Sequence, residues 1–231
     1  TRTLDGKSLS AGTPMMMKTF AAVIFDMDGV LLDSETVCDL VWRKAAKECG
    51  IDGIDKIIEK NRGCNYTDTR ASLEHDLQSV SAADRFMNRI AVLFNKIETE
   101  EGLPSMKGAR EALEYLTKKG YRIALASSTE GDAVRRQMKN AGFIDFFETL
   151  TTGDTVARGK PDPEIYERAC ASLGLSPDVC CAIEDSPNGM RSAYRAGLSC
   201  IMVPDKIAPD DEMKKIAMCI LPSLDAIGTV L

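Results

Sequence analysis

The chain has 231 residues, of which 44% are hydrophobic and 28% charged, and its formal net charge is −6. This composition is typical of a globular protein with one large domain, or one domain and a small appendage. The acidic balance argues against nucleic acid or an anionic membrane as the main partner, because both favour a basic surface. The apolar runs, such as residues 21–25, are too short to span a membrane.

The cysteine pattern argues against a zinc site, because the eight cysteines include no CxxC pair and the only histidine is His75. His75 is expected on the surface of a helix. Adjacent Cys180 and Cys181 are expected on opposite faces of a strand. We expect free thiols and a cytoplasmic location, since disulfides are rare in a reducing cytosol.

The first twenty residues hold no apolar stretch of signal-peptide length. Met15, Met16 and Met17 precede the first segment with a structured pattern. We expect the natural start to lie at these methionines and residues 1–17 to form a disordered extension.

Beyond residue 18, short apolar segments alternate with helical patterns of about 10–12 residues, which indicates βαβ crossovers. The fold class is therefore predicted as α/β, a three-layer Rossmann-like core with a mostly parallel sheet. Strands are predicted at 21–25, 121–127, 146–152, 179–185 and 199–203, with a possible edge strand at 218–221. Helices are predicted at 109–119, 132–142, 163–174 and 188–197.

Residues 34–104 break this alternation. They contain four amphipathic helical segments and no convincing strand. We expect a helical cap domain at 34–104, inserted into a core domain formed by 18–33 and 105–231. The two crossings, near 32–34 and 102–107, are expected to act as hinges. The helical segments are predicted at 34–50, 54–63, 67–77 and 83–102.

Two pairs of carboxylates follow predicted strands. Asp26 and Asp28 end the first strand, and residues two apart in an extended chain face the same side. Glu184 and Asp185 end the strand at 179–185, so four carboxylates are expected at the edge of the sheet where open α/β sheets bind ligands. A simple turn at Asp26–Gly29 and helix capping by Asp185 or Ser186 are the structural alternatives.

Such a cluster needs a cation, because two carboxylates about 4 Å apart repel by roughly 4 kcal/mol at an effective dielectric of 20. An all-oxygen ligand set suits Mg²⁺, which keeps several waters and accepts a phosphate oxygen. The sequence therefore predicts a magnesium site at this edge.

Three further residues are candidates for binding a phosphate. Lys160 lies between a glycine and a proline just before a helix, from where it can point back to the sheet edge beside an aspartate. Ser127 and Ser128 end a strand, and their hydroxyls and the amides after them can hold phosphate oxygens at the next helix start. A surface lysine and helix-capping serines are the alternatives.

Four segments resemble, in order, the motifs of the haloacid dehalogenase superfamily of aspartate-nucleophile phosphotransferases. They are FDMDGVLLDSE, ALASST, GKPDPEIY and IEDSPNG, and they span residues 25–189. The helical insertion resembles the cap of the β-phosphoglucomutase-like branch. The resemblance implies an enzyme that acts on a small phosphorylated metabolite, a sugar phosphate being the expected class. A monomer is the expected oligomeric state.

The resemblance also implies roles for individual residues. Asp26 is the implied nucleophile, which forms an aspartyl phosphate. Asp28 is the implied acid–base group, which protonates the leaving alcohol and then activates water. Ser127, Ser128 and Lys160 are implied to hold the transferring phosphoryl group. The implied Mg²⁺ ligands are the Asp26 carboxylate, the Asp28 backbone carbonyl and Asp185, with Glu184 nearby or bound through water.

Both phosphatases and mutases belong to the family that the sequence resembles. The mutases carry a histidine, an arginine and a lysine where this chain has Cys38, Tyr66 and Glu130. These departures weaken a site for a second phosphate, so we expect a Mg²⁺-dependent phosphomonoesterase, with a β-phosphoglucomutase-type phosphotransferase as the alternative. A non-catalytic phosphate-ligand binding protein is a second alternative. Candidates for a compensating cation are Arg62, Arg70 and Lys96, and Trp42 either faces the substrate or packs between cap helices.

Overall fold

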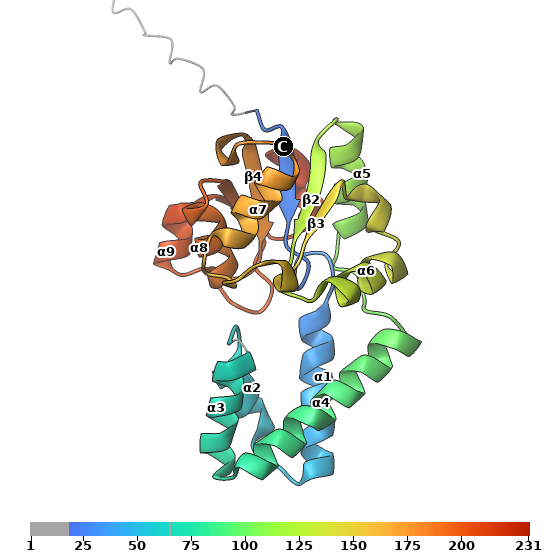
Figure 1. Ribbon diagram of the computed structural model, residues 1–231, viewed down its shortest axis with the longest axis vertical. Coiled ribbons are helices and arrows are strands. Elements are labelled where there is room, and N and C mark those ends of the chain that lie inside the picture. The colour runs from blue at the N-terminus through green and yellow to red at the C-terminus, as the bar shows by residue number, and fades with distance from the viewer. Residues whose placement is uncertain (1–18, 65) are drawn as a thin grey trace, which may run out of the picture.

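Six short strands form one parallel sheet in the part of the chain that the computed structural model describes, residues 19–64 and 66–231. The strand order is β3-β2-β1-β4-β5-β6, with helices on both faces (Figure 1). The predicted α/β fold with a three-layer core is confirmed. The extension predicted at 1–17 lies outside the described residues. The strands are β1 (Ala22–Phe25), β2 (Arg122–Ala126), β3 (Thr149–Thr151), β4 (Cys180–Glu184), β5 (Ser199–Met202) and β6 (Ala217–Ile220).

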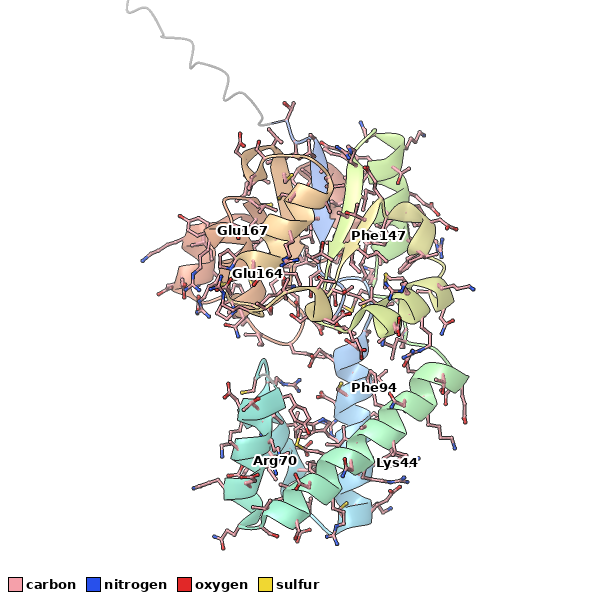
Figure 2. All side chains as sticks on the ribbon, viewed as in Figure 1. Lys44, Arg70, Phe94, Phe147, Glu164 and Glu167 are labelled. Carbon is pink, nitrogen blue, oxygen red and sulfur yellow. The ribbon has the colours of Figure 1, made fainter. Side chains whose placement is uncertain are left out.

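Side chains of β1 alternate between two apolar layers, which explains its continuous apolar sequence. Val23 and Phe25 pack in one layer with two of the core helices, α5 and α6, whereas Ala22 and Ile24 pack in the other layer with α7, α8 and α9, whose bounds are given below. Phe147, labelled in Figure 2, packs edge-on against Phe25 with ring centroids 6.4 Å apart. Cys180 and Cys181 of β4 face opposite layers, as predicted. The helices are α5 (Ala109–Lys118), α6 (Gly131–Asn140), α7 (Glu164–Ser172), α8 (Pro187–Arg195) and α9 (Asp211–Ile216).

Two details of the core differ from the sequence prediction. The strand expected at 146–152 is limited to Thr149–Thr151, because residues 144–146 form a 3₁₀ turn. The helix α9 was not predicted, since six residues are too few for a helical period to show. All eight cysteines are free thiols, and the His75 side chain is 86% exposed, as expected. Among the described residues, no helix is long and apolar enough to cross a membrane.

In the described part of residues 34–104, which we call the cap, four helices pack around an apolar cluster of their own. Asp33 begins the first helix by accepting a hydrogen bond from the Thr36 amide at 3.2 Å. Trp42 packs edge-on against Phe86 of the last helix, with ring centroids 5.6 Å apart. The helices are α1 (Ser34–Cys49), α2 (Ile54–Asn61), α3 (Tyr66–Leu77) and α4 (Val80–Glu100).

The two connections between the cap and the core run side by side. The Asp33 amide donates to the Pro104 carbonyl at 2.8 Å, and the Met106 amide donates to the Leu31 carbonyl at 2.9 Å. The chain therefore enters and leaves the cap through one hydrogen-bonded link. That this link is a hinge and that the cap is a separate domain remain predictions.

Polar contacts also join the cap to the core away from this link. Arg136 of α6 donates through Nε and Nη2 to the two carboxylate oxygens of Glu98 on α4, both at 2.7 Å. The Glu98 side chain is 2% exposed, so its charge depends on this partner. Lys206, in the loop after β5, donates to the Thr36 hydroxyl at 2.9 Å.

We expect Arg136→Ala to lower the free energy of unfolding by about 1–3 kcal/mol, because it leaves the buried Glu98 carboxylate without its partner. The measurement is urea denaturation. Arg43→Ala is the matched control, since it removes an ion pair with Asp55 whose side chains are 51% and 75% exposed, and such pairs are worth about 0–1 kcal/mol. Equal losses of stability in both variants would contradict the conclusion that the buried Glu98 carboxylate depends on Arg136 as its partner.

Candidate active site

Three carboxylates converge at the carboxyl edge of the central strands. β1 and β4 are neighbours with Phe25 opposite Ile183, so the residues that follow them meet at one edge. Ligand oxygens of Asp26, Glu184 and Asp185 lie within 4.8 Å of one another. The sequence predicted this convergence for four carboxylates, and the fourth, Asp28, is not part of the cluster.

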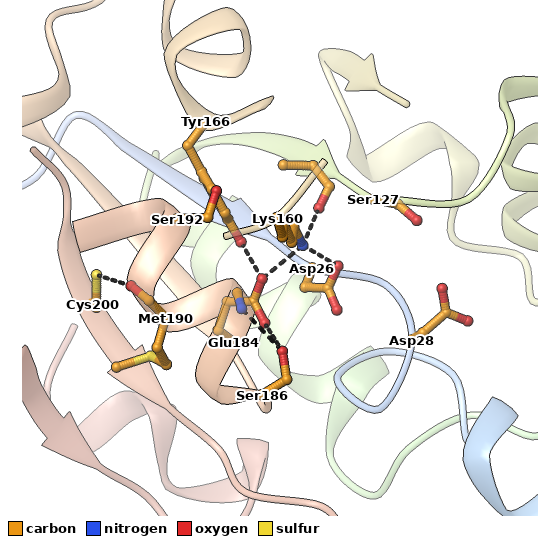
Figure 3. Close-up of polar contacts among 12 residues, drawn as sticks. Asp26, Asp28, Ser127, Lys160, Tyr166, Glu184, Ser186, Met190, Ser192 and Cys200 are labelled. Atoms are coloured by element: carbon orange, nitrogen blue, oxygen red, sulfur yellow. Dashed lines mark hydrogen bonds and ion pairs between the residues drawn. The ribbon is translucent and has the colours of Figure 1, made fainter. Parts of the chain in front are cut away.

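Lys160 is the positive centre of this cluster (Figure 3). Its ammonium group donates to Asp26 Oδ1 at 2.7 Å, to Glu184 Oε1 at 2.7 Å and to the Ala126 carbonyl at 3.0 Å. The side chains of Lys160 and Glu184 are 8% and 0% exposed. The loop before α7 therefore points the lysine back to the sheet edge, where it binds two carboxylates at once.

Tyr166 supports the same pair from α7 and was not predicted. Its hydroxyl donates to Glu184 Oε1 at 2.7 Å, and its ring lies 5.2 Å from the Lys160 ammonium. The sequence signal was an aromatic residue with a polar end on the buried face of a predicted helix, which usually finds a hydrogen-bond partner.

The electrostatics of the cluster follow from burial and crowding. Burial raises the pKa of Asp26 to about 8, helped by repulsion from Glu184 and Asp28 and opposed by attraction to Lys160. Burial and repulsion from Glu184 and Asp26 also raise the pKa of Asp185. Burial alone would lower the pKa of Lys160, but attraction to Asp26 and Glu184 raises it above its ordinary value. One lysine therefore does not fully compensate three carboxylates.

Asp28 lies apart from this cluster and faces the neighbouring strand. Its carboxylate accepts a hydrogen bond from the Thr129 hydroxyl at 2.9 Å. The Thr129 amide in turn donates to the Ser127 hydroxyl at 3.1 Å, and Ser127 is fully buried. Ser128 is exposed and lines the cavity above the cluster. Thr129, which follows the two predicted phosphate-binding serines, thus orients the second aspartate.

Two glycines let the carboxylates lie directly against the backbone. A Cβ on Gly189, in the first turn of α8, would lie 2.0 Å from the Glu184 carboxylate. A Cβ on Gly29, whose φ is +76°, would lie 2.4 Å from Asp185 Oδ2. Ser186 caps α8 by accepting from the Gly189 amide at 3.1 Å, so the capping considered for Asp185 or Ser186 is made by Ser186.

A cavity of about 540 Å³ lies over the cluster, between the core and the cap. Asp26, Asp28 and Lys160 line it from the core, and Glu35 and Asp68 line it from the cap. Its volume is within the range of about 300–1,000 Å³ that is usual for small-molecule sites. The cluster therefore lies at the end of a cavity that is large enough for a metabolite-sized ligand.

Comparison with known proteins agrees with this geometry. Residues 23–203 match the family model of haloacid dehalogenase-like hydrolases. The chain belongs to this family. It is 33% identical over 195 residues to the putative phosphatase YhcW of Bacillus subtilis, covering 80% of this chain and 84% of that protein. It is 30% identical to hexitol phosphatase B of Escherichia coli, covering 88% and 92% of the two chains. The family predicted from the motifs is confirmed, and the chain is a phosphatase-type enzyme of this family.

Relatives of the mutase type and solved structures also match. The β-phosphoglucomutase of Bacillus subtilis is 30% identical, over 79% of this chain and 82% of that protein. The crystal structure of a putative β-phosphoglucomutase from Thermotoga maritima is similar with a TM-score of 0.76 and 28% identity, over 90% and 97% of the two chains. A family hydrolase from Deinococcus radiodurans, solved with bound phosphate and sodium, has a TM-score of 0.75 and 29% identity, over 91% and 94%.

We expect Gly189→Ala to destabilise the protein by about 1–3 kcal/mol, because the new methyl group must displace the Glu184 carboxylate or α8. This is opposite to the usual gain from alanine in a helix. Gly159→Ala is the control, since nothing lies within 4 Å of a Cβ there, and a change within about 0.5 kcal/mol is expected. Urea denaturation compares the two.

In excess chelator, we expect the wild type to lose stability as the pH rises from 5 to 8. The folded-state pKa of Asp26 is about 8, well above the unfolded value of about 4, so the folded state binds more protons over this range. Asp26→Asn reduces this effect to the part that is due to Asp185, and the variant is expected to melt higher than the wild type at pH 8 by about 2–4 °C for each kcal/mol of relieved repulsion. A calorimetric difference that does not grow with pH would contradict the crowding of the cluster.

Proposed function

We propose that the chain is a Mg²⁺-dependent phosphomonoesterase that acts on a small phosphorylated sugar or polyol through an aspartyl phosphate on Asp26. The observation that carries the proposal is the buried Asp26–Lys160–Glu184 ion pair network beside Asp185, at the end of a capped cavity. The names of the relatives, which include carbohydrate and hexitol phosphatases, support the substrate class.

The residues of the cluster fit a magnesium ion. Asp26, Glu184 and Asp185 offer only oxygen atoms within 4.8 Å of one another, and Lys160 supplies one positive charge for three carboxylates. Mg²⁺ prefers oxygen ligands and is bound by few protein carboxylates together with substrate phosphate. When bound, it would keep Asp26 ionised and neutralise charge on the transferring phosphoryl group.

The roles of the two aspartates follow from their different surroundings. Lys160 donates to Asp26 Oδ1 and so fixes the orientation of the carboxylate that attacks phosphorus. Lys160 also places a positive charge where the phosphoryl oxygens must lie, and Ser127 and Ser128 lie at the end of the adjacent strand β2. Asp28 lines the cavity but binds Thr129 instead of the cluster, which suits a group that gives a proton to the leaving alcohol and takes one from water.

The charges of the cap favour water over a second phosphate group as the acceptor. Arg62 donates to Asp39 and Glu59, and Arg70 on α3 pairs with Glu74 and Asp84 (Figure 2). Both arginines, candidates for a compensating cation, are therefore already neutralised by carboxylates. Lys96 is 65% exposed and lies 4.0 Å from Glu100, and the exposed Glu130 begins α6. A mutase needs cations that hold the distal phosphate of a bisphosphate.

Asp26→Asn and Asp28→Asn are expected to fail differently. Asp26→Asn removes the nucleophile, so no aspartyl phosphate forms and phosphate release is abolished. Asp28→Asn keeps the cluster intact and is expected to slow turnover by about 10²–10⁴-fold, the usual contribution of a positioned acid–base group. The measurement is phosphate release under saturating Mg²⁺, with Mg²⁺ binding to Asp28→Asn as the control. Equal, mild losses in both variants would show that the two roles are not distinct.

The direct test of the function is a panel of sugar, polyol and nucleotide monophosphates assayed for phosphate release. We expect at least one sugar or polyol phosphate to be hydrolysed at about 1–10³ s⁻¹ without a bisphosphate activator, the usual range for enzymes. Chelator should abolish this turnover and added Mg²⁺ should restore it. If the wild type isomerises β-glucose 1-phosphate faster than it hydrolyses any monophosphate, the proposal is wrong.

A further inference from the structure

A second cavity, of about 220 Å³, lies within the cap next to the active-site cavity. Glu35, Gly63 and Cys64 line both cavities. The rest of the lining of this cap cavity comes from α1, α2 and α3, and includes Asp39, Asn61 and Arg62. A phosphomonoester whose phosphate lies at Asp26 therefore directs its alcohol part toward the cap cavity.

A buried hydrogen-bond acceptor in this lining has no partner among the described residues. Asn61 is 7% exposed, and its amide nitrogen donates to the Ile57 carbonyl at 2.7 Å, whereas its Oδ1 accepts no hydrogen bond from residues 19–64 and 66–231. Buried polar groups are normally paired, and those that are not require an explanation. An unpaired acceptor in the lining of a cavity can be satisfied by a ligand that donates a hydrogen bond to it.

The charges of the cap cavity are acidic in balance. Among the described residues that line it, Arg62 is the one cation, and it donates to Asp39 at 3.2 and 2.9 Å and to Glu59 at 2.8 Å. Glu35 lies 3.8 Å from the same guanidinium. Burial and repulsion from Asp28 raise the pKa of Glu35, and attraction to Arg62 opposes them. Three carboxylates therefore share one guanidinium, and negative charge remains in excess.

We propose that the cap cavity selects an alcohol part that is rich in hydrogen-bond donors and carries no negative charge, as in the monophosphate of an uncharged or amino-bearing polyol. This inference rests on the proposed function, because it assumes that the phosphate lies at Asp26. Hydroxyl and ammonium groups donate to Glu35, Asp39 and Asn61. A carboxylate or a second phosphate on the alcohol part is repelled by these oxygens. Among the described lining residues, the one cation, Arg62, is already shared by carboxylates.

The test compares substrates of equal length that differ in one property. Sorbitol 6-phosphate and 6-phosphogluconate differ at the far end, which is a hydroxymethyl group in the first and a carboxylate in the second. We expect kcat/KM for 6-phosphogluconate to be lower by about 10–100-fold, from repulsion by one unit charge near a partly buried carboxylate. n-Hexyl phosphate, which lacks the hydroxyl donors, is expected to be at least about tenfold poorer than sorbitol 6-phosphate. Equal values for the three substrates would overturn the inference.

A variant tests the origin of the selectivity. Asp39→Asn removes one negative charge and releases Arg62, so the preference for sorbitol 6-phosphate over 6-phosphogluconate is expected to shrink by about tenfold. Asp55→Asn is the control, because Asp55 pairs with Arg43 on the surface of the cap and lines neither cavity. The readout is a ratio within each variant, so partial unfolding of one variant does not alter it. An unchanged ratio in Asp39→Asn would overturn the inference.

Binding separates this inference from the proposed function. Calorimetric titration of Asp26→Asn with the same two ligands, in saturating Mg²⁺, reports selectivity without turnover. If the wild type releases phosphate from no monophosphate, the proposed function is wrong, and the titration still decides the inference. Equal affinities for the two ligands contradict the inference, whereas tighter binding of sorbitol 6-phosphate supports it.

Discussion

The Lys160 ammonium group holds the active-site edge of this protein together. It binds Asp26, which follows β1, and Glu184, which is the last residue of β4, and also the carbonyl of the last residue of β2. The carboxyl ends of three neighbouring strands thus contact one positive charge. Removing the lysine is expected to cost about 3–5 kcal/mol, because the carboxylates of Asp26 and Glu184 then remain buried without a cation. Tyr166, which donates to Glu184, and Gly189, which has no side chain to displace the Glu184 carboxylate, both allow close packing around this contact.

The surplus of carboxylates links stability to chemistry. A cluster with more negative than positive charge is unfavourable when no cation is bound, and the raised pKa values of Asp26 and Asp185 express that cost. Under the proposed function, the surplus of two negative charges matches one divalent cation, which would in turn attract the negatively charged phosphate group. Active sites commonly accept such a cost for function.

Much of the fold and part of the site could be predicted from the sequence. The strands β1 and β4 are apolar on both faces, and parallel pairing brings Asp26 and Glu184 together once their ends are known. The contact between Thr129 and Asp28 joins residues 101 positions apart and depends on side-chain rotamers, which no pattern reveals. The neutralisation of Arg62 depends in the same way on how α1 packs against α2. The excess negative charge of the cap cavity was therefore not predictable from the sequence. The absence of the mutase histidine, arginine and lysine could be seen directly in the sequence, at Cys38, Tyr66 and Glu130.

The paired connections at residues 31–33 and 104–106 have an evolutionary consequence. Their hydrogen bonds hold the two ends of the insertion together, so the path of the chain through the sheet does not depend on what lies between them. Changes in length or sequence there are tolerated most easily when the flanking backbone is already tied down. This arrangement allows residues 34–104 to vary while the carboxylates and the lysine at the sheet edge stay in place. Under the proposed function, a new specificity would require substitutions within this one segment and no rebuilding of the sheet.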